Sequence, residues 1–137
     1  MPRTPSKERL AGLTFVFVWF FIGGIAHFAK TDLEVSIMPP YVPWPRAAVL
    51  VSGVFELWGA FGILYGPTRR VAGIGLLALT TAVTPANLYM AQHPDQFHIA
   101  EWILIARLPL QLALLALIDW STSAWIWRPK PPATPTQ

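Results

Sequence analysis

Five polar side chains stand within long apolar stretches of the sequence and have the chemistry to bind or protonate a small molecule. They are one carboxyl, one imidazole, one guanidinium and two amides, on Glu56, His27, Arg107, Asn87 and Gln111. A carboxyl and an imidazole can exchange protons, whereas a guanidinium and amides donate hydrogen bonds to oxygen atoms. An ionisable residue at the centre of a membrane costs about 2.5–3.5 kcal/mol, so it normally faces other helices and has a function. We therefore take the carboxyl and the imidazole as candidate catalytic groups and the other three side chains as candidate ligand-binding groups.

The apolar stretches that hold these residues are long enough to cross a membrane. They are Leu10–Phe28, Ala47–Tyr65, Val71–Met90 and Trp102–Ile118. Each is close to the roughly 20 residues that a helix needs to cross a hydrocarbon core of about 30 Å. The chain is 54% hydrophobic and 12% charged, and only Glu56 and Arg107 among its charged residues lie inside the stretches. Because a soluble domain has about 25% charged residues, the composition indicates four transmembrane helices.

The predicted fold is all-α, an integral membrane bundle of four antiparallel helices. We expect a cytoplasmic segment over residues 1–9, a transmembrane domain over 10–124 with helices at about 10–28, 46–65, 71–90 and 102–122, and a disordered cytoplasmic tail over 125–137. The short sequence Gly66–Arg70 predicts a tight turn between the second and third helices. The connection Met38–Pro45 is rich in proline and predicts a stiff apolar cap on the membrane surface.

The distribution of basic residues predicts the orientation in the membrane. Cytoplasmic connections carry an excess of Lys and Arg. One side of the predicted bundle holds Arg3, Lys7, Arg9, Arg69, Arg70, Arg128 and Lys130, and the other side holds only Lys30 and Arg46. The richer side contains both termini, so both termini are predicted to be cytoplasmic.

The polar groups are predicted to meet in the outer half of the membrane. Glu56 lies ten residues along its helix from Arg46 and is therefore about 15 Å deep at 1.5 Å per residue. Pro85 and Pro109 lack an N–H, which leaves the carbonyls of Thr81 and Ile105 without their helical donors. We expect a cavity at this level, with Met38–Pro45 above it. Further candidate ligand contacts are Ser52, Tyr41 and Trp44.

Each of these residues also has a purely structural interpretation. Glu56 can be paired with Arg107 or bonded to a neighbouring helix, and Arg107 can extend toward the membrane surface. Asn87 and His27 can serve as caps at helix ends. His93, Asp95 and His98 are expected to be loop residues and not a metal site. Gly59, Gly62 and Gly66 are expected to allow close packing of helices.

Several functional classes are excluded or disfavoured by composition. The chain has no Cys, which excludes disulfides, thiol nucleophiles and Cys-based metal or cluster sites. Its net charge of +3 comes from scattered basic residues, so no nucleic-acid partner is expected. No intrinsic cofactor is predicted, and a quinone is expected only as a ligand.

Longer motifs resemble those of DoxX-like proteins, which are small membrane proteins of bacteria. The resemblance rests on Ser52–Leu64 followed by Pro67–Gly73, and further on His27-Phe28, Met38–Tyr41, Pro85–Met90 and Arg107–Gln111. It covers about residues 14–120 and implies a four-helix bundle in the bacterial inner membrane. Some relatives in that family are subunits of thiosulfate:quinone oxidoreductase, and others accompany redox enzymes. The distantly similar vitamin K epoxide reductases work through cysteines, which this chain lacks.

Three functional hypotheses follow. The first is a binding subunit or small enzyme for a quinone-like or other apolar, carbonyl-bearing molecule, in which Glu56 and His27 exchange protons with the ligand. Any redox role then needs a membrane or soluble redox partner, and a homo-oligomer is also compatible with the sequence. The second is a scaffold or assembly factor in the membrane. The third is a small transporter, which is disfavoured because the chain shows no inverted repeat.

The orientation can be tested directly. A reporter fused after Gln137 should read as cytoplasmic, because seven of the nine basic residues outside the apolar stretches lie on the side of the termini. A periplasmic reading would overturn both the orientation and the depths assigned to the polar residues.

Overall fold

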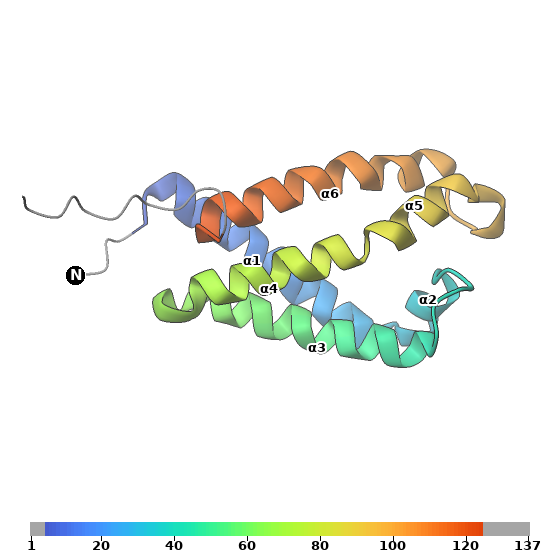
Figure 1. Ribbon diagram of the computed structural model, residues 1–137, viewed down its shortest axis with the longest axis horizontal. Coiled ribbons are helices and arrows are strands. Elements are labelled where there is room, and N and C mark those ends of the chain that lie inside the picture. Colours follow the sequence, from blue (N-terminus) through green and yellow to red (C-terminus); the bar gives the residue numbers. More distant parts are fainter. Residues whose placement is uncertain (1–4, 125–137) are drawn as a thin grey trace, which may run out of the picture.

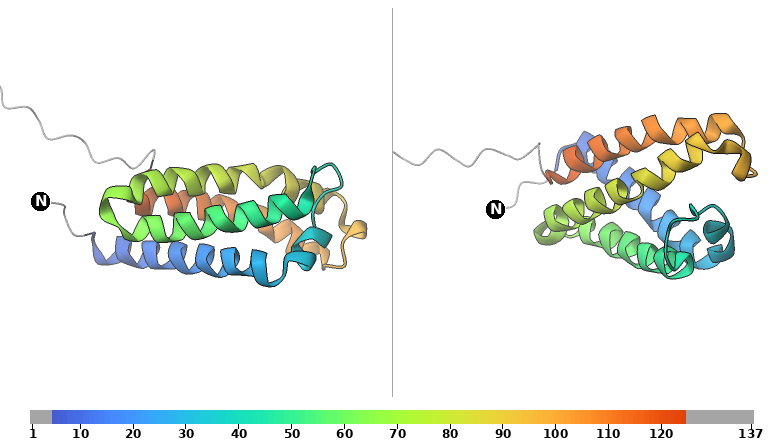
Figure 2. Two further views of the ribbon diagram at one scale, coloured as in Figure 1. Left: turned by 90° about the horizontal axis from the view of Figure 1, so that it is seen from below. Right: turned by 45° about the vertical axis from the view of Figure 1, so that its right-hand side comes forward.

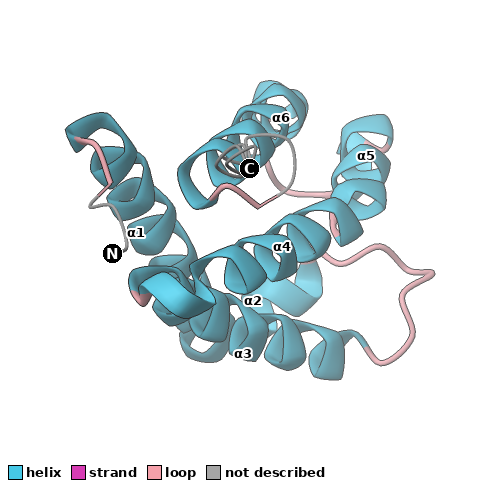
Figure 3. Cartoon of the chain, turned by 60° about the vertical axis from the view of Figure 1, so that its left-hand side comes forward, coloured by secondary structure: helices cyan, strands magenta, loops and turns pink. Residues whose placement is uncertain are grey.

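The computed structural model of the protein describes residues 5–124, and all regular secondary structure in this part is helical (Figure 1). The helices are α1 (Lys7–Ala29), α2 (Thr31–Ser36), α3 (Pro45–Leu64), α4 (Gly66–Ala82), α5 (Thr84–Gln92), the 3-10 turn η1 (Pro94–Gln96) and α6 (Glu101–Thr122). Only loops join them, and residues 5–124 contain no strand (Figure 3). The predicted all-α class is therefore confirmed. The predicted disordered tail, 125–137, lies outside the described residues.

Four helical spans are long and apolar enough to cross a membrane, as the sequence predicted. They are Lys7–Ala29, Pro45–Leu64, Gly66–Gln92 and Glu101–Thr122, and the third combines α4 with α5. The first span begins earlier than predicted, because Ser6 caps the helix by accepting a hydrogen bond from the backbone N–H of Arg9 at 3.3 Å. Residues 7–9 thus belong to α1 and not to a separate N-terminal segment.

The connection between α3 and α4 is shorter than the predicted turn over Gly66–Arg70. Those residues form the first turn of α4, where Pro67 is tolerated because its missing N–H would have no helical partner. Thr68 Oγ1 donates to the carbonyl of Gly62 at 2.7 Å, and Arg69 Nε donates to the carbonyl of Ile63 at 2.8 Å. Side chains of α4 therefore satisfy the last carbonyls of α3 and hold the two helices as neighbours.

The long connection between α1 and α3 contains a short helix that the sequence analysis did not predict. α2 starts directly after α1, and Thr31 Oγ1 donates to the carbonyl of His27 at 2.7 Å. Arg46 of α3 pairs with Asp32 of α2 at 2.6 Å on the surface. The proline-rich part is the loop that follows α2 and leads into α3.

A break separates α4 from α5 at Val83, and proline explains its position. Pro85 lies in the first turn of α5, where the absence of its N–H removes no bond within that helix. Pro109, in contrast, lies inside α6, which continues from Glu101 to Thr122. Both prolines lie within helices that the sequence predicts to be continuous, at about 71–90 and 102–122, and only Pro85 coincides with a break.

The long helices enclose a small apolar core. α1 packs against α3 and α6, and α4 also packs against α3 and α6. The short helix α5 packs against α6 (Figures 1 and 2). The core residues come from all four long helices and include Val16, Ala60, Leu76 and Ile118. Many large apolar side chains face outward, such as Trp58 at 70% and Leu112 at 68% exposure. An outer surface of this kind suits a hydrocarbon environment.

Glycines allow the closest helix contacts. A Cβ on Gly53 of α3 would lie 2.8 Å from His27 Cβ and 3.2 Å from the carbonyl oxygen of Gly24 in α1. A Cβ on Gly59 would overlap with Leu76, and one on Gly62 would lie 2.7 Å from Ala72 Cβ. These two glycines therefore serve close packing as predicted. Gly66 does not, because a Cβ there would meet nothing within 4 Å.

The substitution Gly53→Ala should destabilise the protein because the added methyl group has no room between α1 and α3. Overpacking of this kind costs about 1–3 kcal/mol. Thermal unfolding in detergent measures the effect, and Gly75→Ala is the matched control because a Cβ at Gly75 meets nothing within 4 Å. Equal unfolding temperatures for the two variants would show that the contact between α1 and α3 is not this tight.

Candidate functional site

The carboxyl group of Glu56 is paired with the imidazole of His27. Glu56 Oε1 lies 3.3 Å from His27 Nε2, and both side chains are largely buried, at 17% and 18% exposure. The other oxygen, Oε2, lies against Gly23, where a Cβ would come within 2.7 Å of it. Gly23 of α1 therefore makes room for the carboxylate of α3. The sequence analysis offered Arg107 as the structural partner of Glu56, and the structure places His27 there instead.

The guanidinium of Arg107 has no carboxylate partner among residues 5–124. Its one hydrogen-bond contact among residues 5–124 is from Nη1 to the sulfur of Met90, at 3.7 Å. The ion pairs in this part of the chain are His27–Glu56 and Arg46–Asp32. A thioether is a weak acceptor, so most of the donors of Arg107 are available to an oxygen atom from outside the protein.

Gln111 joins α6 to the break between α4 and α5. Its Nε2 donates to the carbonyl of Thr80 at 2.8 Å and also to Thr84 Oγ1, and its Oε1 accepts from Asn87 Nδ2 at 2.6 Å. Gln111 is 7% exposed. The carbonyl that receives a side-chain donor is therefore that of Thr80, whereas the sequence analysis pointed to Thr81.

These groups line two adjoining hollows, which we call together the polar cavity. The deep hollow is about 340 Å³ and reaches Thr80, Gln111 and Leu114. The loop-side hollow is about 300 Å³ and reaches Met38 and Val42 of the connection after α2. The two hollows share His27, Glu56, Leu79, Val83, Asn87 and Arg107. Volumes of this size fall at the lower end for small-molecule sites, and the combination of an apolar wall with a few polar groups is typical of them.

The structure brings together most of the predicted site residues. The polar cavity contains His27, Glu56, Asn87, Arg107 and Gln111, and the loop-side hollow adds Ser52. Tyr41 and Trp44 do not line it. Tyr41 packs edge-on against Tyr89 and is 56% exposed, and Trp44 is 81% exposed. The loop after α2 thus covers the cavity with its aliphatic residues and turns its aromatic residues outward.

Comparison with known proteins identifies a family whose function is unknown. Residues 16–124 match the model of a domain of unknown function, DUF8561. The chain belongs to the DUF8561 family. No curated protein and no solved structure matches the chain. The matched part contains every residue of the polar cavity, so the cavity lies wholly within the DUF8561 domain.

The sequence analysis missed some polar residues of the DUF8561 domain. Three buried residues near the end of α6 are not among the predicted site residues: Asp119, Ser121 and Thr122. Nearby, Arg9 donates to the carbonyl of Trp120 at 2.9 Å. The three buried residues lie within the helix predicted over about 102–122 but beyond the apolar stretch Trp102–Ile118, in which the candidate polar groups were sought.

The loop histidines do not form a metal site in the described part of the domain. Residues 5–124 contain no group of three His, Cys, Asp or Glu side chains placed to hold a metal ion. His93 stacks on the ring of Tyr89 at 4.2 Å between centroids, and its Nδ1 lies 3.0 Å from the Tyr89 carbonyl oxygen.

The substitution Gln111→Leu should destabilise the domain because it leaves Asn87 and the carbonyl of Thr80 without their buried partner. Leaving such groups unpaired costs about 1–3 kcal/mol. Thermal unfolding in detergent measures the loss. The control Gln96→Leu removes an exposed hydrogen bond to Tyr89 and should have little effect. If both variants unfold at the wild-type temperature, the Gln111 bonds contribute nothing to helix packing.

Proposed function

We propose that this protein is a multi-pass protein of the bacterial inner membrane that binds a quinone-like or other small, apolar, carbonyl-bearing ligand. It would form an antiparallel four-helix bundle with both termini in the cytoplasm and the polar cavity in the outer half of the bilayer. The four apolar spans and the asymmetry of basic residues support this placement. The resemblance to DoxX-like proteins supports a role as a subunit or accessory of a redox process.

The observation that carries the proposal is that Arg107 lacks a strong hydrogen-bond acceptor among residues 5–124. A guanidinium inside a group of apolar helices normally pairs with a carboxylate, because an unpaired charge there is costly. Arg107 lines both hollows of the polar cavity, and its hydrogen bond among residues 5–124 is to the sulfur of Met90. A carbonyl oxygen of a ligand would give this guanidinium a stronger acceptor than the described part of the chain supplies.

The remaining lining suits the rest of such a ligand. Leu79, Val83 and Leu110 give the cavity apolar walls that favour a ring with little charge. Asn87 lies beside Arg107 in both hollows and can donate to the same ligand, although one of its N–H groups is used by Gln111. A pocket with apolar walls and a few fixed donors binds an amphipathic molecule in one orientation.

The pair of Glu56 and His27 would supply the proton chemistry. Reduction of a quinone to a quinol takes up two electrons and two protons. The electrons would come from a redox partner in or at the membrane, and the pair would pass protons to the ligand oxygens. Both residues line the two hollows, so the pair lies at the wall of the space that the ligand would occupy.

A scaffold without ligand chemistry is the second candidate, and the Gln111 network favours it. Gln111, Asn87 and Thr84 satisfy one another between helices, as polar residues do when they serve packing alone. The two candidates differ in what they require of Arg107, since only ligand binding needs its free donors.

Binding can be tested with a ubiquinone that carries a single prenyl unit, added to the purified protein in detergent. A ligand at 100 times its dissociation constant stabilises the folded state by about 2.7 kcal/mol, so the unfolding temperature of the wild type should rise. The rise should disappear in Arg107→Ala because the donor to the ligand oxygen is lost.

The matched control is Arg46→Ala, which removes an arginine that is paired with Asp32 on the surface. This variant should keep the full rise in unfolding temperature. If the wild type is not stabilised by the ubiquinone, or if Arg107→Ala is stabilised as much as the wild type, the proposed function is wrong.

A further inference from the structure

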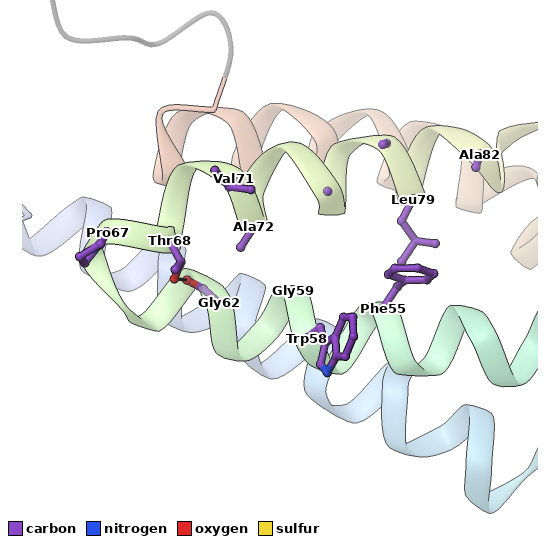
Figure 4. A pocket seen from close by; sticks show the side chains of 12 residues that line it. Phe55, Trp58, Gly59, Gly62, Pro67, Thr68, Val71, Ala72, Leu79 and Ala82 are labelled. Carbon is purple, nitrogen blue, oxygen red and sulfur yellow. Dashed lines mark hydrogen bonds between the residues drawn. The ribbon is translucent and has the colours of Figure 1, made fainter.

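A long apolar groove runs between α3 and α4 on the outer surface of the helices (Figure 4). Its volume is about 780 Å³, and its walls include Phe55, Trp58, Gly59, Ala72 and Gly75. It extends along α4 from Pro67 to Ala82, which is about 22 Å at 1.5 Å per residue. The groove is thus longer than the depth of one leaflet of hydrocarbon, about 15 Å.

The groove offers an apolar surface and almost no hydrogen-bonding capacity. Thr68 is the hydroxyl residue in its lining, and Thr68 Oγ1 is already bonded to the carbonyl of Gly62, as the dashed line in Figure 4 marks. Trp58 is 70% exposed and Phe55 is 53% exposed, and their rings form an edge-on pair at one wall. The groove therefore fits an alkyl or prenyl chain and no polar ligand.

Leu79 separates this groove from the polar cavity. Its side chain lines the groove and both hollows of the cavity, and Ala82 lines the groove and the loop-side hollow. Figure 4 shows Leu79 extending from α4 toward Phe55 of α3. A single leucine on α4 thus lies between an outward-facing apolar channel and the space beside Arg107.

We propose that the groove between α3 and α4 holds the apolar tail of the ligand whose polar head lies in the polar cavity, and that the head enters between the two helices past Leu79. This inference rests on the proposed function and adds to it that the ligand is a long-tailed amphipath taken from the bilayer. The tail would run from Leu79 toward Pro67, away from the end at which α2 lies.

The wall that the two spaces share is the reason for choosing a tail as the occupant. A ligand with its head beside Arg107 and a chain of any length must place that chain somewhere, and the groove lies on the other side of Leu79. The apolar tail of the ligand would cover the apolar surface of Gly75, Ala78 and Trp58 and would displace no hydrogen bond. A ligand that lacked a tail would use the polar cavity alone.

The substitution Gly75→Leu tests the groove without touching the polar cavity. A Cβ at Gly75 meets nothing within 4 Å, and Gly75 lines the groove, so the new side chain would occupy part of the groove. The matched control is Gly66→Leu, which is also on α4, also meets nothing within 4 Å, and does not line the groove. If Gly75→Leu fails to fold, Ala78→Leu serves, because Ala78 is an exposed residue of the groove.

Two probes with the same quinone head and different tails distinguish the contribution of the tail to binding from that of the head. Decylubiquinone carries a ten-carbon tail, and the second probe carries one prenyl unit. Decylubiquinone should bind the wild type more tightly, and Gly75→Leu should weaken it about tenfold, the effect of losing apolar contact for roughly two methylene groups. Binding of the short probe should not change in Gly75→Leu, and Gly66→Leu should change neither.

The outcomes distinguish this inference from the proposed function. If both probes bind the wild type equally, or if Gly75→Leu leaves decylubiquinone unaffected, while Arg107→Ala still abolishes binding, the groove is not the tail site but the proposed function stands. If a ten-carbon alcohol without a quinone head displaces decylubiquinone as well as the short probe does, the groove holds ordinary lipid chains and the inference is wrong. If neither probe binds, both proposals are wrong.

Discussion

The burial of one carboxyl group between apolar helices is the constraint on which the rest of the arrangement depends. Glu56 lies on a helix that is apolar enough to cross a membrane, so its oxygens need partners within the protein. His27 supplies one, and it reaches Glu56 because Gly53 lets α3 approach α1 closely, while Gly23 leaves space for the second oxygen. The glycines and the polar pair are thus a single structural feature, in which packing at the backbone fixes the position of the ionisable groups.

Besides the pair of His27 and Glu56, two groups of polar residues in and around the cavity have different roles. Gln111, Thr84 and Asn87 satisfy one another across the gap between α6 and the break at Val83, so they fix how α5 and α6 lie against α4. Arg107 belongs to the second group, since its contact with the sulfur of Met90 leaves most of its donors free. Helix packing accounts for the first group and not for the second. The binding hypothesis depends on this difference.

The sequence predicted the helices better than the contacts between their side chains. Long apolar stretches indicate spanning helices whatever their neighbours are, so the four spans were predicted to within a few residues. The position of Glu56, Arg107 and Gln111 along their helices also indicated that they would meet at one level. Rotation about each helix axis decides the partners, and it depends on close contacts such as that of Gly53 with His27, which spacing along one helix does not reveal. Tyr41 and Trp44 were also predicted to contact the ligand, but they lie in a loop whose path helical spacing does not predict, and both are exposed.

The bond between Gln111 and the break in the third span also constrains how the chain enters the bilayer. The ribosome synthesises α6 after α4 and α5 are complete. Until Gln111 arrives, the carbonyl of Thr80 and the amide of Asn87 lack the partner that they have in the finished protein. Unpaired polar groups of this kind cost free energy in hydrocarbon. If the spans cross a membrane, the nascent third span is therefore more stable near water or beside the insertion machinery until the fourth span joins it. The last two spans are in this respect one unit of biogenesis, although they pack as separate helices in the mature molecule.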